Sequence, residues 1–381
     1  MLHLPPLYPI TDATRPEPLS EQVRRLGEAG FPLVQFRGKP LDALAQWTEL
    51  RAALAESAAN GGWPQICVND RADLALLAAQ EGLPPWGLHL GQDDLPASEA
   101  RALPGLAGLH FGASTHEAGE WSALDPACDH AGVGPFRGTA TKADHSAPVG
   151  LEGLRVGCAA LRARGLAPVA IGGLGLADAA DCFEAGAESL AMVGEVHRAA
   201  DPAALGWEVQ RHRWRVRPPF RPGQGLVLLG GSGAGKTSLG RLLAFRMALP
   251  FHDLDEVIEA REGRPVAEIF AASGEARFRA LEAELLPDLL GAPSVVALGG
   301  GAWETPANRA AVAASHFVPL WLAESPARAW ERAGRDPKRP LAQDRTAFMA
   351  RWRARMPAWA QADMLLAFGH SSRELASALL D

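Results

Sequence analysis

GGSGAGKT, residues 230–237, matches the phosphate-binding pattern G-x-x-x-x-G-K-[ST] at every fixed position. The apolar run at 225–229 predicts a buried strand before this loop, and leucines at helical spacing in 238–249 predict a helix after it. Glycines let backbone N–H groups point at a polyphosphate, and the helix N-terminus adds favourable partial charge. The stretch therefore predicts a nucleotide site in which Lys236 reaches the outer phosphates and Thr237 serves Mg²⁺.

The length of the chain, 381 residues, suits two domains better than one. Apolar residues make up 48% of the chain and charged residues 21%, which is enough for two cores. We see no signal peptide at the N-terminus and no apolar stretch long enough to cross a bilayer. The four cysteines lack metal-ligand spacing, which favours packed thiols in a reduced, cytoplasmic setting.

The net charge of −7 comes from an acidic first half, whereas the second half is balanced. This distribution argues against nucleic acid as a main partner.

An arginine- and proline-rich stretch divides the two halves. Prolines block the continuation of a helix, and glycines follow them. We therefore expect domains at 1–211 and 225–381 with a linker at 212–224. The arginines fit either a docking surface for the acidic first half or a solvated connector, and the weakness of exposed ion pairs favours the connector. These residues are Arg211, Arg213, Arg215, Arg217 and Arg221.

Eight apolar runs in the first half predict strands. They lie at 7–11, 32–36, 65–69, 87–90, 109–114, 130–134, 168–171 and 189–193. Helical stretches rich in alanine and leucine, such as 41–58 and 71–80, separate most of them. Eight strands with helical crossovers predict a closed parallel (β/α)8 TIM barrel, an α/β fold.

Polar residues and glycines follow nearly every predicted strand, where this architecture gathers functional groups. Arg37, Lys39 and Lys142 are cations suited to a diphosphate, whereas Asp70 and Asp94 are carboxylates suited to Mg²⁺. The other rim residues are Gln35, Asn69, Ser114, His116, Thr139, Thr141, Gly172, Gly173 and Gly194. The rim thus predicts two phosphorylated ligands, one of them with a metal.

The motifs of the first half resemble thiamine-phosphate synthase over residues 5–206. They are YPITD at 8–12, QFRGK at 35–39, ND at 69–70, HLGQDD at 89–94, GASTH at 112–116, TATK at 139–142 and IGG at 171–173. The resemblance implies that a hydroxymethylpyrimidine diphosphate loses pyrophosphate to the nitrogen of a thiazole phosphate. It also implies that Asp70 and Asp94 bind Mg²⁺, that Arg37, Lys39 and Lys142 stabilise the leaving pyrophosphate, and that Gln35, Asn69, Ser114, Thr139 and Thr141 orient the substrates. In this architecture the glycines after the seventh and eighth strands, Gly172, Gly173 and Gly194, commonly hold a phosphate through backbone N–H groups.

Three positions depart from this family pattern. Gly38, Gly138 and Gly194 stand where the family usually has an acidic residue, a proline and a serine. They leave open a barrel of impaired activity that acts as a binding or dimerising module. A related family, the thiazole tautomerases, uses a histidine in the loop of His116, although His116 also suits a hydrogen-bonded rim residue. The retained diphosphate set favours the synthase.

Further motifs follow the phosphate loop. Asp253 and Asp255 are two residues apart at a predicted strand end, which places both on one side of the strand. Arg279 and Arg355 are planar forks suited to one shared carboxylate. The triple glycine at 299–301 permits close approach of the backbone to a ligand.

Together with GEARFR at 274–279 and KRPL at 338–341, these motifs resemble shikimate kinase over residues 225–381. The resemblance implies a parallel sheet flanked by helices and transfer of a phosphoryl group from ATP to the 3-hydroxyl of shikimate. It implies that Asp255 orients or deprotonates this hydroxyl, that Asp253 and Thr237 serve Mg²⁺, and that Glu282 orients Arg279. The implied shikimate contacts are Asp255, Arg279, Gly300, Gly301 and Arg355. The implied ATP contacts are Gly231, Gly233, Ala234, Gly235, Lys236, Thr237, Ser238, Arg332 near adenine, and Arg339 from a lid, where it stabilises the transferring group.

The sequence therefore predicts a two-domain enzyme with two unrelated activities on small molecules, using ATP and Mg²⁺ in the second half and Mg²⁺ in the first. A kinase for another polyol acid remains an alternative, because two arginines indicate a carboxylate without naming its bearer. The sequence leaves open whether copies of the chain form a homo-oligomer.

Overall fold

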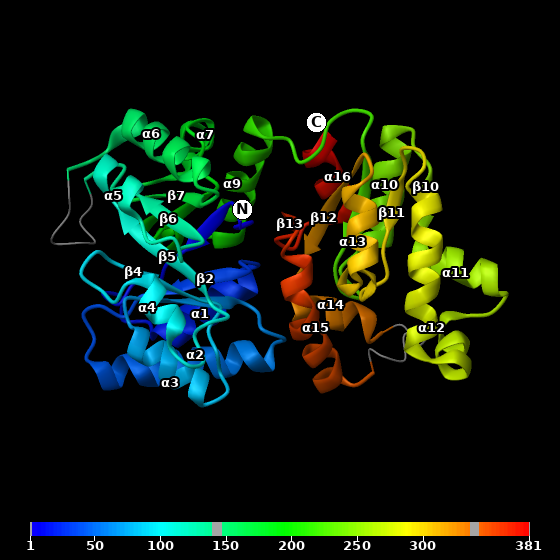
Figure 1. The fold of residues 1–381 in the computed structure, drawn as a ribbon, viewed down its shortest axis with the longest axis horizontal. Coiled ribbons are helices and arrows are strands. Elements are labelled where there is room, and N and C mark those ends of the chain that lie inside the picture. The colour runs from blue at the N-terminus through cyan, green and yellow to red at the C-terminus, as the bar shows by residue number, and fades with distance from the viewer. Residues whose placement is uncertain (1, 139–146, 336–342, 381) are drawn as a thin grey trace. The chain divides into compact units, whose positions relative to one another are not determined.

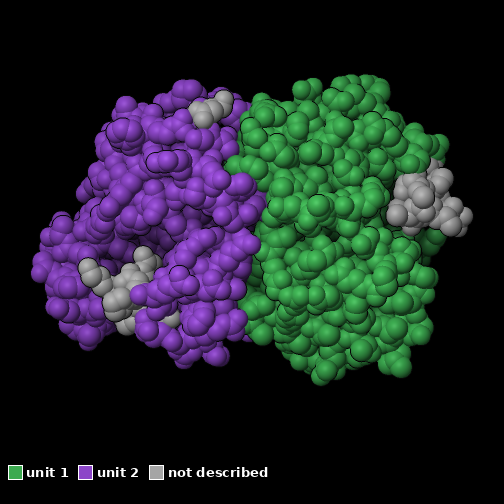
Figure 2. All heavy atoms as spheres, turned by 180° about the vertical axis from the view of Figure 1, so that it is seen from behind, with its two compact units in different colours: residues 1–217 green, residues 218–381 purple. Residues whose placement is uncertain are grey.

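A computed structural model describes residues 2–138, 147–335 and 343–380. The chain divides into two compact units, Met1–Arg217 and Pro218–Asp381 (Figure 2). No helix in the described ranges combines the length and the hydrophobicity needed to cross a bilayer.

The first unit is an eight-stranded parallel sheet whose strands alternate with helices (Figure 1). Its strands are β1 (Leu7–Pro9), β2 (Leu33–Phe36), β3 (Gln65–Asn69), β4 (Gly87–Leu90), β5 (His110–Thr115), β6 (His130–Val133), β7 (Ala167–Ile171) and β8 (Ser189–Met192). They follow the order β1-β8-β7-β6-β5-β4-β3-β2. The Thr11 N–H donates to the Gln35 carbonyl at 2.9 Å, which joins the two end strands. The predicted barrel is confirmed.

Helices cover the outside of this barrel. They are α1 (Leu19–Ala29), α2 (Ala43–Ala59), α3 (Ala72–Gln80), α4 (Ala97–Ala102), α5 (Ala118–Ala123), α6 (Gly150–Ala163), η1 (Leu176–Asp178), α7 (Ala179–Glu184), α8 (Gly194–Arg198) and α9 (Pro202–Val216). An aspartate begins α2, because the Asp42 carboxylate accepts a 2.8 Å hydrogen bond from the Ala45 N–H.

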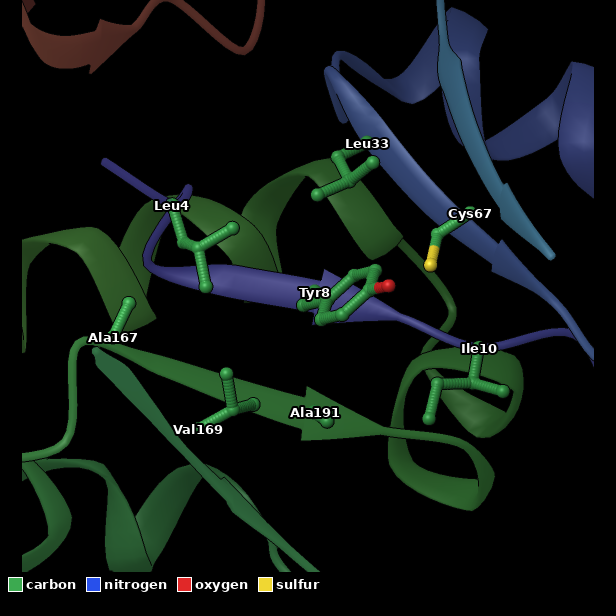
Figure 3. Packing of buried hydrophobic residues seen from close by; sticks show 8 residues of the cluster. All are labelled: Leu4, Tyr8, Ile10, Leu33, Cys67, Ala167, Val169 and Ala191. Atoms are coloured by element: carbon green, nitrogen blue, oxygen red, sulfur yellow. The ribbon is translucent and has the colours of Figure 1, made fainter. Parts of the chain in front are cut away.

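Inward-facing side chains fill the centre of the barrel (Figure 3). Buried residues from β2, β3, β7, β8, β1 and the segments on either side of β1 point toward one another there, and those labelled are Leu4, Tyr8, Ile10, Leu33, Cys67, Ala167, Val169 and Ala191. Successive residues of a strand face opposite sides, so the inward residues two positions beyond Leu33 and Cys67 are Gln35 and Asn69. The packed core thus leads directly to the polar rim.

Helix α9 includes residues 212–216, so the predicted linker begins too early. Arg213 and Arg217 turn back and pair with Glu188, whose side chain is only 8% exposed. A buried carboxylate requires charged or hydrogen-bonding partners. The interpretation as a solvated connector is therefore wrong for these two arginines, because they neutralise a buried acid of the barrel.

The second unit is a parallel sheet in the order β10-β11-β9-β12-β13, flanked by helices. Its strands are β9 (Gly225–Leu229), β10 (Phe251–Asp253), β11 (Val295–Ala297), β12 (Phe317–Ala323) and β13 (Asp363–Leu366). Its helices are α10 (Lys236–Met247), α11 (Leu254–Glu262), α12 (Val266–Leu289), η2 (Ala302–Glu304), α13 (Pro306–Ala313), α14 (Pro326–Ala333), α15 (Arg345–Trp359) and α16 (Ser372–Leu380). The predicted fold is confirmed, with the phosphate loop after the central strand β9.

Two candidate active sites

Two carboxylates and a lysine meet at the rim of the barrel. Asp70 follows β3 with a φ of 63° and pairs with Lys39. Asp94, after β4, lies within hydrogen-bonding reach of Asp70. Burial raises the pKa of Asp94, and the charge of Asp70 adds to the rise, against a 2.6 Å hydrogen bond that the Gly91 N–H donates. The structure thus brings the two predicted metal carboxylates together, and a divalent cation would relieve their repulsion.

This rim offers a metal only part of a ligand set. In the described ranges, no three His, Cys, Asp or Glu side chains are grouped so as to hold a metal ion. Mg²⁺ commonly keeps waters and phosphate oxygens in addition to one or two carboxylates. Asp70 and Asp94 therefore fit Mg²⁺ that arrives with a diphosphate. Beside them, the Arg37 N–H donates to Thr11 Oγ1 at 2.8 Å, which fixes the loop that carries Lys39.

The predicted hydrogen-bonding residues line the inward face above the core. Gln35 Nε2 donates to the Tyr8 hydroxyl at 3.5 Å, Ser114 Oγ lies 3.1 Å from His89 Nε2, and Asn69 ends β3. Sequence reasoning assigned no role to Tyr8 or His89. The alternation of strand residues was the available signal, since His89 pairs in register with the inward-facing Asn69.

A glycine pair makes room where the loops after β6 and β7 meet. Gly172 and Gly173 have φ values of 96° and 68°, and a Cβ on Gly172 would lie 2.6 Å from Pro135 Cα. At the start of α8, a Cβ on Gly194 would meet only the movable guanidinium of Arg198. Three predicted ligands lie outside the described residues: Thr139, Thr141 and Lys142.

Of the two remaining departures, Gly38 and Gly138, only Gly38 has a local explanation. A Cβ on Gly38 would lie 2.7 Å from Gln46 Cγ, so the buried Gln46 occupies the space that an acidic residue would need. By contrast, nothing lies within 4 Å of a Cβ on Gly138. His116 Nδ1 lies 3.1 Å from Glu120, which makes this histidine a paired rim residue.

The phosphate loop of the second unit gathers a lysine, a hydroxyl and a carboxylate. Lys236 Nζ donates to the carbonyls of Gly230 at 2.9 Å and Gly231 at 3.0 Å. Thr237 Oγ1 donates to Asp253 Oδ2 at 2.8 Å, so the two predicted metal ligands are neighbours. The other predicted contacts here form the loop and the first turn of α10: Gly233, Ala234, Gly235 and Ser238.

Asp255 lies in the first turn of α11, so the predicted placement of both aspartates on one strand is wrong. Strand β10 ends at Asp253, whose carboxylate accepts a hydrogen bond from the Asp255 N–H at 3.2 Å and begins the helix. Burial, reinforced by the charge of Asp253, raises the pKa of Asp255 to about 6. Its Oδ1 is buried with no hydrogen-bond partner among the described residues. An elevated pKa of this kind suits a carboxylate that accepts a proton.

Arg279 and Arg355 both reach the triple glycine. A Cβ on Gly301 would collide with the Arg279 guanidinium, and one on Gly300 would lie 3.4 Å from Arg355 Nη1. Arg279 Nη1 donates to Glu282 at 2.8 Å, and the Glu282 side chain is fully buried. Burial raises the pKa of Glu282 to about 7. Glu282 therefore holds Arg279 against Gly301.

The predicted adenine side has fewer described residues. Arg332 pairs with the buried Glu324 at 2.9 Å, whereas Arg339 lies outside the described ranges. Trp359 is buried and packs edge-on against Trp352 with ring centroids 5.3 Å apart. Trp352 lies against the phosphate loop, so this aromatic pair supports the loop from behind.

Comparison with known proteins assigns each half separately. The family model of thiamine monophosphate synthase matches residues 7–196, and that of shikimate kinase matches residues 232–381. A thiamine-phosphate synthase of Chloroflexus aurantiacus is 39% identical over 54% of this chain and 90% of that protein. A shikimate kinase of Ruegeria pomeroyi is 39% identical over 39% of this chain and 78% of that protein.

Among solved structures, a thiamine phosphate pyrophosphorylase of Pyrococcus furiosus is 25% identical, with a TM-score of 0.46 over 55% of this chain and 96% of that one. The family models and the curated relatives agree for both halves. The chain therefore belongs to two enzyme families at once, thiamine-phosphate synthase through its first half and shikimate kinase through its second.

Proposed function

We propose that the second unit transfers a phosphoryl group from ATP to the 3-hydroxyl of shikimate. The strongest support is that Arg279 and Arg355 meet at Gly300 and Gly301. These glycines follow β11, which pairs with β9, the strand that precedes the phosphate loop. Two guanidinium groups at one place favour an acceptor that carries a carboxylate. The phosphate loop supplies the donor site.

Each residue of this site has a separate role in the proposed reaction. Shikimate kinases use ATP with Mg²⁺, and Thr237 and Asp253 are the oxygen donors that would hold the ion, which neutralises phosphate charge when bound. Lys236 would exchange the loop carbonyls for outer phosphate oxygens. Asp255 would accept the proton that leaves the acceptor hydroxyl, and Arg339 would stabilise the transferring group. Arg332 would lie near adenine.

We propose that the first unit joins a hydroxymethylpyrimidine diphosphate to a thiazole phosphate. The thiazole nitrogen forms a bond to the pyrimidine methylene carbon as the bond from that carbon to pyrophosphate breaks, giving thiamine phosphate. Asp70 and Asp94 would hold Mg²⁺ on the diphosphate, and Arg37, Lys39 and Lys142 would stabilise the charge of the leaving pyrophosphate. The residues that would orient the substrates are Gln35, Asn69, Ser114, Thr139, Thr141, Gly172 and Gly173.

We also propose that the chain works in the cytoplasm on these small molecules. All four cysteines are buried and unpaired, a state that a reducing compartment maintains.

Two separate incubations of the purified full chain test these proposals. With ATP, Mg²⁺ and shikimate we expect shikimate 3-phosphate, and with Mg²⁺ and the two thiamine precursors we expect thiamine phosphate, both identified by mass spectrometry. If the first mixture yields only hydrolysed ATP, the acceptor assignment is wrong. If the second mixture yields no thiamine phosphate, the barrel is a binding module or another enzyme.

A further inference from the structure

Two glutamates bind the guanidinium of Arg279 from different sides. Glu282 accepts from Nη1 at 2.8 Å and is fully buried. Glu275 accepts from Nη2 at 2.7 Å, and its side chain is 61% exposed. Glu282 belongs to the interior, whereas Glu275 lies where it can be released to water.

The nitrogen that Glu275 occupies is the one closest to the triple glycine. A Cβ built on Gly301 would meet Arg279 Nη2 before any other atom. This is the side on which the proposed function places the carboxylate of shikimate. Glu275 therefore holds the donor that an incoming carboxylate needs.

A kink in the backbone directly precedes Glu275. Gly274 has a φ of 74° and interrupts α12, so Glu275 is the first residue of the segment that continues to Leu289. A Cβ on Gly274 would have nothing within 4 Å, so the space beside this glycine is open.

Arg355 shows the opposite arrangement. Its Nε donates to Glu304 at 3.0 Å, whereas its Nη1 lies at Gly300. Glu304 thus binds a nitrogen away from the glycine and leaves the other end of the fork directed at the acceptor site.

We propose that Glu275 is an internal stand-in for the carboxylate of the acceptor, and that substrate binding displaces it from Arg279. Glu282 and Glu304 stay in place and are positioning residues. This inference rests on the proposed kinase function. The side chain of Arg279 is only 21% exposed, and Glu282 binds only its Nη1, so an acceptor on Nη2 is favourable before substrate arrives. An exchange of one carboxylate for another keeps that charge compensated throughout, and only an anionic acceptor can drive it.

Matched isosteric variants of the full chain test this proposal, because it predicts that the KM for shikimate changes in opposite directions at two residues. Glu275→Gln weakens the stand-in, so the KM for shikimate at saturating ATP falls about two- to fivefold with kcat within about twofold, the range expected for an exposed ion pair. Glu304→Gln loosens a positioning contact, so the KM rises about twofold or more. Glu284→Gln on the same helix, where Glu284 pairs with Arg261, is the control and leaves the KM unchanged.

A KM for Glu275→Gln that stays at or above the wild-type value overturns the stand-in. A KM that falls in both Glu275→Gln and Glu304→Gln overturns the distinction between a glutamate that occupies an acceptor-facing nitrogen and one that binds a nitrogen facing away. Thermal unfolding of each variant verifies that it is folded, and direct titration with shikimate verifies that the KM change reflects binding. A wild-type chain that does not phosphorylate shikimate would instead contradict the proposed kinase function.

Discussion

Burial decides the protonation state of several single side chains. His130 in β6 is fully buried, and neither ring nitrogen has a hydrogen-bond partner among the described residues. Burial, with a contribution from His89, lowers the pKa of His130 to about 3. The folded barrel therefore contains a neutral imidazole at any physiological pH, and this histidine is packed as an aromatic ring against Tyr8, Trp86 and His89.

This buried imidazole predicts acid sensitivity of the first unit. Below its ordinary pKa of about 6.5 the unfolded chain binds a proton that folded His130 accepts only near pH 3. The free energy of unfolding therefore falls as pH decreases through that window, by about 1 kcal/mol per pH unit from this residue. Thermal unfolding between pH 4.5 and 7.5 should show a shallower pH slope for His130→Gln than for wild type.

The slope is the informative quantity, because the substitution also alters packing. His110→Gln is the control, since His110 is partly exposed at the start of β5. Equal slopes for wild type and His130→Gln would mean that this imidazole already titrates normally in the folded state.

The second prediction at the residue scale concerns the role of Asp255 as proton acceptor in the proposed kinase reaction. Removing its proton-accepting oxygen in Asp255→Asn should lower the kcat of the kinase about 10²- to 10⁴-fold, the usual contribution of a general base. ATP affinity should change little, because Lys236 and Thr237 remain. Steady-state kinetics with Glu256→Gln as control tests this, since the exposed Glu256 pairs only with Arg241 in the described structure. A loss of less than tenfold would leave Asp255 a binding residue.

At the scale of elements, the sequence predicted the bounds of a strand or helix best where its residues are buried. Strand β9 was predicted at its observed bounds because all five residues are apolar and buried, as parallel strands usually are. Strand β10 has three residues, and an Asp-x-Asp pattern fits a strand end and a capped helix equally well, so Asp255 was misplaced. The first domain was predicted to end before helix α9 does, because the arginines of α9 pair with Glu188, a contact between residues distant in sequence.

The candidate sites show the same division. Asp70, Asp94, Thr237 and Asp253 lie within short motifs at strand ends, where topology alone brings them together. Tyr8 and His89 were quoted within motifs but given no role, because inward-facing residues of a strand look like core positions until the barrel closes.

The testable prediction at this scale concerns the buried carboxylate that binds helix α9. Glu188→Ala leaves Arg162, Arg213 and Arg217 converging on one place without their shared carboxylate. Breaking a buried ion pair by removing one partner typically costs about 3–5 kcal/mol. Denaturant unfolding should show that loss in the first unit, with kinase activity unchanged. Glu208→Ala, which removes only the partly exposed partner of Arg211, is the control. Equal stability of both variants would mean that the cluster does not stabilise the docking of α9.

At the scale of the whole molecule, two families with unrelated products share one chain. Each unit is compact by itself and has its own proposed phosphate-binding groups and its own pair of proposed metal ligands. The motifs of each half were sufficient to predict this organisation, because every proposed ligand of one site comes from a single unit. No residue proposed for one site belongs to the other unit.

The most direct test of this independence measures both activities in each of two reciprocal variants. Lys236→Ala removes the cation of the phosphate loop and should abolish phosphorylation of shikimate while thiamine phosphate formation continues at the wild-type rate. Asp94→Ala removes one carboxylate of the barrel and should do the reverse. Loss of both activities in either variant would contradict two self-sufficient sites in one chain.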